Sequence, residues 1–107
     1  MRDDRVVSEQ PIGERLVLAN DRIRVWEDVV APGDQQPVHT HRSPYLSVML
    51  TAADAEVVDD TGQVVYRVQR GVGDATWFGA DRIPTTHTLR NTGSDDVRVL
   101  VVEVLGS

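Results

Sequence analysis

The feature that most constrains this fold is a repeated alternation between short apolar, β-branched segments and clusters of turn-forming residues. Clusters of Gly, Pro, Asn and Asp recur at a spacing of about 8–12 residues, which is typical of all-β domains. The apolar segments span residues 15–19, 22–30, 38–41, 45–51, 55–59, 64–69, 75–78, 86–90 and 97–105. No window carries an apolar stripe of helical period long enough for a stable helix. The sequence therefore predicts an all-β fold, as a sandwich, a barrel or a jelly roll.

The turn clusters and the last segment add detail to this prediction. Asn20-Asp21 and Asp60-Thr61-Gly62 join neighbouring segments through residues that tolerate positive φ, so each predicts a tight hairpin. Segment 97–105 has apolar residues at both odd and even positions. That pattern predicts a central strand that is buried on both faces.

Length and charge narrow the classes of function. The chain has 107 residues, which is one domain's worth of sequence. Seventeen acidic residues against eleven basic ones, all of them arginine, give a net charge of −6, which predicts no binding to nucleic acid or to anionic membranes. The apolar runs are far shorter than the ~20 residues of a membrane span, and residues 1–7 show no secretory signal. We therefore expect a cytoplasmic protein with no membrane partner.

The three histidines carry the functional signal. The chain has no cysteine, so a metal ion would have to be bound by nitrogen and oxygen ligands. His39 and His41 are two residues apart in an expected strand, which places both side chains on one face about 6.6 Å apart. His87 lies in another expected strand. A single histidine is more often a surface or core residue than a ligand, but a close pair plus a distant third predicts a divalent metal site.

This pattern of histidines resembles the two sequence motifs of the cupin superfamily. Gly33 followed by five residues and then His39-Thr40-His41 matches the start of the first motif. His87 followed by three residues and Asn91 matches the end of the second motif. The chain is also similar to a group of small single-domain cupins labelled β-alanine degradation proteins. The resemblance implies a single-domain cupin jelly-roll β-barrel with a metal ion inside.

The resemblance also implies how the chain is divided and assembled. It makes residues 1–107 one cupin domain, in which 20–105 form the barrel and 1–13 form an N-terminal arm or an edge strand. Small cupins commonly pair, so the resemblance implies a homodimer.

The sequence departs from the family pattern at one metal ligand. The glutamate of the first motif would fall at Tyr45 or Leu46, and neither residue supplies a carboxylate. The implied ligand set is therefore reduced to His39, His41 and His87. Some cupin dioxygenases bind their metal with three histidines, and three imidazoles also suit zinc with one open position. Nitrogen ligation leaves iron, zinc, nickel and manganese as alternatives.

Several other residues are candidates for the site. Tyr45 is the candidate catalytic residue, as a hydrogen-bond partner of substrate or of metal-bound water; its alternative role is a structural aromatic of the barrel. The candidate substrate-binding residues are Arg24, Trp26, Met49, Trp77 and Arg90. For the tryptophans the alternative is a place in the core, and for the arginines it is the solvated surface. Glu103 is a possible hydrogen-bond acceptor for a ligand imidazole.

Two classes of function follow from these residues. The first is a metal-dependent enzyme that acts on a small polar molecule, of dioxygenase type or of isomerase or lyase type. The alternative is a non-catalytic module that binds a small molecule or a metal, or an accessory subunit of a larger enzyme. The missing glutamate favours the alternative, whereas the three histidines at ligand positions favour the enzyme.

Overall fold

The computed structural model describes residues 12–106. In this part of the chain nine strands form, together with one 3-10 turn, η1 (Ala80–Arg82). The strands are β1 (Arg15–Ala19), β2 (Ile23–Val30), β3 (His39–His41), β4 (Tyr45–Met49), β5 (Ala53–Val58), β6 (Val64–Arg70), β7 (Ala75–Phe78), β8 (Thr85–Asn91) and β9 (Val97–Val104). The all-β prediction is confirmed. No helix in the described range is long and apolar enough to cross a membrane.

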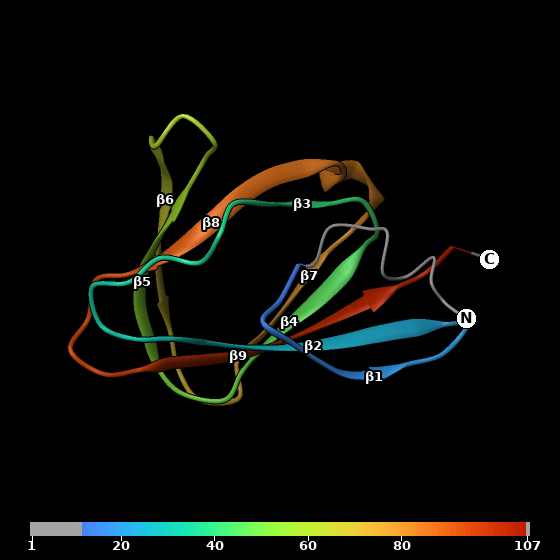
Figure 1. Cartoon of the computed structure of the whole chain (residues 1–107), viewed down its shortest axis with the longest axis horizontal. Coiled ribbons are helices and arrows are strands. Elements are labelled where there is room, and N and C mark those ends of the chain that lie inside the picture. Colours follow the sequence, from blue (N-terminus) through green and yellow to red (C-terminus); the bar gives the residue numbers. More distant parts are fainter. Residues whose placement is uncertain (1–11, 107) are drawn as a thin grey trace.

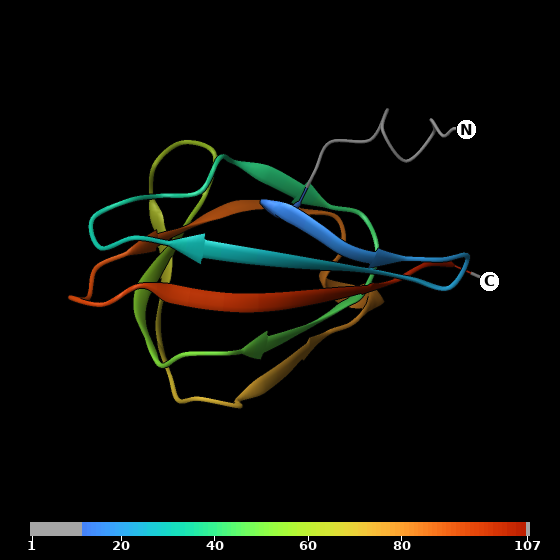
Figure 2. The same cartoon turned by 60° about the horizontal axis from the view of Figure 1, so that its bottom comes forward.

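The strands form two antiparallel sheets that lie against each other as a jelly roll (Figures 1 and 2). One sheet has the order β1-β2-β9-β4-β7 and the other has the order β3-β8-β5-β6. β3 and β8 therefore lie in the sheet opposite to β2 and β4. Functional side chains from both sheets can point into the space between them.

Both predicted hairpins are present. Asn20 Oδ1 accepts hydrogen bonds from the backbone N–H groups of Arg22 and Ile23, at 2.8 and 2.9 Å, between β1 and β2. Between β5 and β6, Gly62 has a φ of +92°, a conformation that residues with a side chain rarely adopt. These local side-chain and glycine preferences explain why turn chemistry alone located the hairpins.

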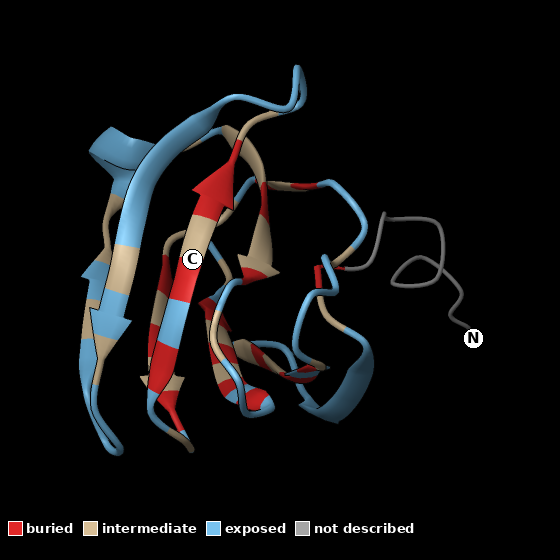
Figure 3. Cartoon of the chain, turned by 90° about the vertical axis from the view of Figure 1, so that its left-hand side faces the viewer, coloured by how far each residue is buried: buried red, intermediate tan, exposed pale blue. Residues whose placement is uncertain are grey.

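The core lies between the sheets, and buried residues alternate with less buried ones along the strands (Figure 3). One cluster comprises Val30, Met49, Ala53, Val97 and Val99, and a second comprises Ile12, Tyr45 and Val101.

The prediction for the last strand is half right. β9 is the central strand of its sheet, but only its odd-numbered residues are buried, because no other part of the described chain covers the outer face of that sheet.

The N-terminal arm falls mostly outside the described residues. Residues 1–11 lie outside the described range, so the arm or edge strand expected over residues 1–13 stays a prediction for those residues. Ile12 itself lies in the core, since it is 5% exposed and packs with Tyr45 and Val101. The expected homodimer likewise stays a prediction.

Candidate metal centre

The three histidines meet on the inner face of one sheet. β3 pairs with β8 so that His39 lies directly opposite His87, and His41 follows on the same face two residues later. The ring centroids are 4.8 to 5.0 Å apart. One ligand atom from each residue can be chosen so that all three lie within 4.8 Å of one another. The prediction that His39, His41 and His87 converge is confirmed.

Two of the donor atoms have the spacing of ligands on one metal ion, and the third lies close to them. His39 Nδ1 lies 3.1 Å from the carbonyl oxygen of Pro37, so this nitrogen donates and leaves Nε2 with a free lone pair. His39 Nε2 and His41 Nε2 are 3.1 Å apart. Two nitrogens bound to one metal ion at about 2.0–2.1 Å lie about 3 Å apart, which matches this spacing. The other nitrogen of His41, Nδ1, is buried and has no hydrogen-bond partner among the described residues, so either nitrogen of this ring is available as a ligand.

Burial keeps the imidazoles neutral. Desolvation lowers the pKa of His39, and it lowers the pKa of His87 to about 4. His41 is 2% exposed, and desolvation together with the two neighbouring imidazoles lowers its pKa to about 2. Neutral imidazole is the form that binds metal, so protons do not compete for these lone pairs near neutral pH.

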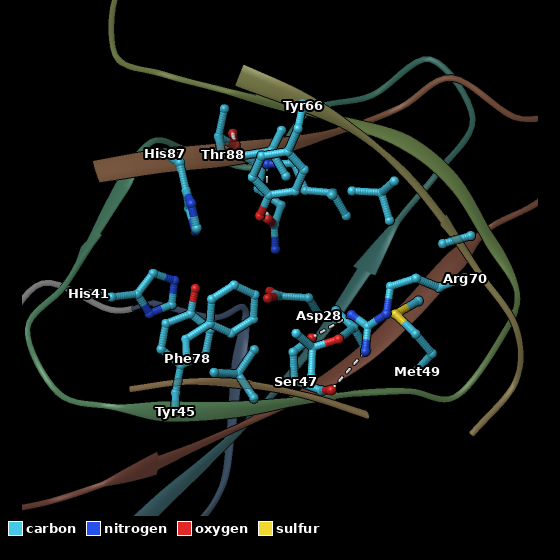
Figure 4. Close-up of a pocket in the computed structure, with 18 of the residues that line it drawn as sticks. Asp28, His41, Tyr45, Ser47, Met49, Tyr66, Arg70, Phe78, His87 and Thr88 are labelled. Carbon is cyan, nitrogen blue, oxygen red and sulfur yellow. Dashed lines mark hydrogen bonds between the residues drawn. The ribbon is translucent and has the colours of Figure 1, made fainter. Parts of the chain in front are cut away.

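The histidines line one side of a cavity of about 250 Å³ between the sheets (Figure 4). Asp28 projects into the same cavity, and Arg70 and Met49 lie on the side away from His41 and His87. The apolar and aromatic part of the lining comprises Ile12, Tyr45, Met49, Ala53, Val57, Tyr66, Val68, Phe78, Leu89, Val99 and Val101. The cavity therefore has the imidazoles at one end, Arg70 at the other, and Asp28 together with mostly apolar walls between them.

Tyr45 is in the cavity, as the sequence predicts. Its ring stacks on His41, with centroids 3.9 Å apart, and on Phe78, with centroids 4.6 Å apart. The side chain is thus a structural aromatic that also touches a candidate ligand. Burial raises the pKa of the Tyr45 hydroxyl above its ordinary value, so the hydroxyl keeps its proton and can donate a hydrogen bond.

Asp28 was not predicted as a site residue. It lies on β2, is 4% exposed, and accepts a hydrogen bond from the backbone N–H of Glu14 at 2.7 Å. Desolvation raises the pKa of Asp28 to about 6, against a smaller lowering by hydrogen bonds from Glu14 and Gln36. The sequence places Asp28 directly after Glu27 in a strand segment, and nothing in that segment reveals which of the two carboxylates faces the cavity.

The predicted substrate-binding residues are divided between the cavity and other places. Met49 lines the cavity, whereas Arg24, Trp26, Trp77 and Arg90 do not. Arg24 Nε is 3.0 Å from Glu103 Oε1, and Trp26 Nε1 donates to the same oxygen at 2.8 Å. Glu103 thus binds these two side chains, and no hydrogen bond joins it to the histidines in the described structure.

The other two predicted substrate-binding residues, Trp77 and Arg90, lie outside the cavity lining. Trp77 is 54% exposed on β7, and Arg90 forms an ion pair with Glu56. The alternative roles, in the core or at the surface, therefore describe these side chains better than contact with a molecule in the cavity.

Comparison with known proteins shows the fold. No family model matches the chain, and no curated protein sequence matches it. A cupin domain from Bordetella pertussis is similar in structure with a TM-score of 0.66 and 22% identity, over 86% of this chain and 91% of that one. A protein with a double-stranded β-helix domain from Klebsiella pneumoniae is similar in structure with a TM-score of 0.64 and 18% identity, over 100% of this chain and 90% of that one.

A third similar structure carries the name of an enzyme. It is a sugar phosphate isomerase of the cupin superfamily from Silicibacter pomeroyi, with a TM-score of 0.54 and 21% identity, over 79% of this chain and 52% of that one. At these identities the comparisons bear on architecture alone. Together with the two sheets and the inward-facing histidines, they show that this chain has the double-stranded β-helix fold of cupin domains.

Proposed function

We propose that this protein is a metal-dependent enzyme that moves a proton next to a carbonyl group of a small molecule, as isomerases and lyases do. One observation carries the proposal: the three imidazoles and the buried carboxylate of Asp28 line one cavity. The histidines would hold iron, zinc, nickel or manganese. When bound, such an ion polarises a carbonyl oxygen or, as iron(II), binds dioxygen.

Asp28 supplies the acid–base group. A carboxylate with a pKa of about 6 accepts and returns protons efficiently near neutral pH. It takes a proton from the carbon beside the carbonyl, which gives an enol or enolate. It returns the proton to the same carbon or, in an α-hydroxy carbonyl compound, to the former carbonyl carbon while the hydroxyl hydrogen moves to the former carbonyl oxygen, so that the molecule is neither oxidised nor reduced as a whole. The backbone N–H of Glu14 holds the carboxylate in place during this transfer.

Tyr45 has a supporting role in this proposal. Its hydroxyl keeps its proton and can donate a hydrogen bond to an oxygen atom of the substrate. Its stacking on His41 also fixes the ring plane of that candidate ligand.

Metal content tests the first half of the proposal. Protein purified without an affinity tag is expected to contain about one metal ion per chain by mass spectrometry. His39→Ala is expected to lose the ion. Thr40→Ala is the matched control, because Thr40 hydrogen-bonds Thr86 on the neighbouring strand and lies outside the cavity lining. Wild-type protein that binds none of the four metals after reconstitution would refute the proposal.

Hydrogen exchange tests the second half. The metal-loaded protein, incubated with small ketones and keto acids in deuterated water, is expected to exchange the hydrogen beside the carbonyl. Asp28→Asn is expected to retain the metal and lose the exchange. If metal is bound but neither exchange nor oxygen consumption occurs, the protein is a binding module or an accessory subunit. Dioxygenase chemistry and similarity to the β-alanine degradation group stay predictions.

A further inference from the structure

Arg70 places a cation in the cavity, away from the histidines. It is the last residue of β6, and it lies opposite His41 and His87 across the cavity (Figure 4). Its Nη1 donates to Ser47 Oγ at 3.0 Å, and its Nη2 donates to the carbonyl oxygens of Ser47 and Asp74, both at 2.9 Å. Three of the five N–H donors of a guanidinium are thereby used, and two remain.

No carboxylate forms an ion pair with Arg70 in the described part of the chain, although the negative charge of Asp74 acts on Arg70 from farther away and favours its charged form. Within residues 12–106 every hydrogen-bond acceptor of the guanidinium is uncharged, and no carboxylate oxygen lies within 4.0 Å of it. The carboxylate of Asp74 is turned to the backbone N–H of Gly71, at 2.7 Å. By contrast, Arg90 and Arg98 form ion pairs with Glu56 and Glu27.

Partial burial makes an anion a favourable partner for Arg70. Desolvation lowers the pKa of Arg70, although a guanidinium stays protonated near neutral pH. A cation that has lost part of its hydration regains that free energy through charge-assisted hydrogen bonds to an anion. Arg67, the other arginine of the lining, has a side chain that is 63% exposed and lies 3.8 Å from carboxylates of Asp54 and Glu56.

The charges of the cavity favour an anionic molecule. Asp28 is the one carboxylate among its described lining residues, and three neutral imidazoles would leave a divalent ion with its full charge. With Arg70, the occupied cavity carries a net positive charge that an anion would offset. A cavity of about 250 Å³ is slightly below the usual range for drug-sized ligands, so it suits a small molecule.

We propose that Arg70 binds the carboxylate of a short keto acid or hydroxy acid, whose second oxygen function faces the three histidines. The apolar walls between the two ends match the hydrocarbon part of such a molecule. Only one part of this inference rests on the proposed function, namely that the second oxygen function of the molecule faces a metal ion held by the three histidines. Recognition of the carboxylate by Arg70 stands on the contacts of Arg70 itself.

The test compares an acid with its neutral amide. Acetoacetate and 4-oxopentanoate, each beside its primary amide, are titrated into full-length protein by calorimetry, with and without bound zinc. At least one acid is expected to bind wild-type protein about tenfold or more tightly than its amide, because the amide lacks the charge that Arg70 recognises. In Arg70→Gln the ratio of the dissociation constant of the amide to that of the acid is expected to fall to nearly one.

Controls separate this proposal from the proposed function. Arg22→Gln removes the same charge at an exposed position outside the cavity lining, and it is expected to keep the wild-type preference. Circular dichroism and thermal unfolding establish that each variant is folded. If zinc does not bind but the metal-free protein still prefers acids, only the proposed function fails. Absence of acid binding in wild-type protein, or a preference that survives Arg70→Gln, would overturn the role of Arg70.

Discussion

Asp28 gives a stability prediction that needs no substrate and no metal. An unfolded aspartate loses its proton near 3.8, whereas Asp28 in the folded chain holds its proton up to about 6. Between these values the folded state binds more protons than the unfolded state, so folding stability falls as the pH rises. At about 1.4 kcal/mol per pKa unit, the loss approaches about 3 kcal/mol above pH 6. At about pH 4.5 it amounts to about 1 kcal/mol.

Asp28→Asn removes this titration while keeping the shape of the side chain. We expect the free energy of unfolding of the variant, relative to wild type, to increase by about 2 kcal/mol between about pH 4.5 and about pH 7.5. Urea unfolding of both proteins in the presence of a chelator measures this difference. Titrations shared by the two chains, including those of the histidines, cancel when one free energy is subtracted from the other.

A second variant controls for loss of any carboxylate. Asp59 is half-buried, and hydrogen bonds from Thr61 and Gln63 hold its pKa below the ordinary value. A lowered pKa gives stability that is already present at about pH 4.5, so Asp59→Asn should give a nearly constant difference over the same pH window. A constant difference for Asp28→Asn as well would refute the inference that burial desolvates Asp28. A difference that decreases with pH would instead show that Asp28 is stabilised as a carboxylate.

Three further predictions follow from the structure. Zinc at a hundredfold excess over its dissociation constant should stabilise the wild type by about 2.7 kcal/mol in calorimetry, and His87→Ala should lose this gain. Tyr45→Ala should cost about 3–5 kcal/mol in urea unfolding because it removes a ring stacked on both sides, whereas Tyr45→Phe should cost less than about 1.5 kcal/mol. Gly62→Ala should cost about 1 kcal/mol because of the positive φ of Gly62, and Gly106→Ala should have nearly no effect in the same assay.

The strands could be predicted because the signals for them are local. Turn residues and β-branched segments act over a few residues, and they gave all nine strands of the described chain. The ends of strands depend on partners distant in the sequence. β5 begins at Ala53 rather than at residue 55, since Ala53 and Asp54 pair with Arg70 and Gln69 of β6.

The histidines could be predicted and the charged cavity residues could not. Spacing within β3 places His39 and His41 on one face whatever the rest of the fold does. Asp28 and Arg70 reach the cavity because of how the two sheets lie against each other, which no short stretch of sequence records. The double-sided burial expected of β9 failed for a related reason, because coverage of a sheet face is a property of the whole fold.

The replacement of the expected glutamate by Tyr45 has a consequence for charge. A glutamate ligand would offset one unit of the charge of a bound divalent ion, whereas the neutral tyrosine offsets none. The negative charge of the cavity lies instead on Asp28, which belongs to the sheet opposite to the three histidines and has a pKa of about 6, close to neutral pH. A carboxylate bound to a metal ion is a poor base, because the ion holds its electron pairs. Under the proposed function, a tyrosine in place of a carboxylate ligand, with Asp28 elsewhere in the cavity, would separate metal binding from proton transfer and leave the positive charge of the ion available to an anionic substrate.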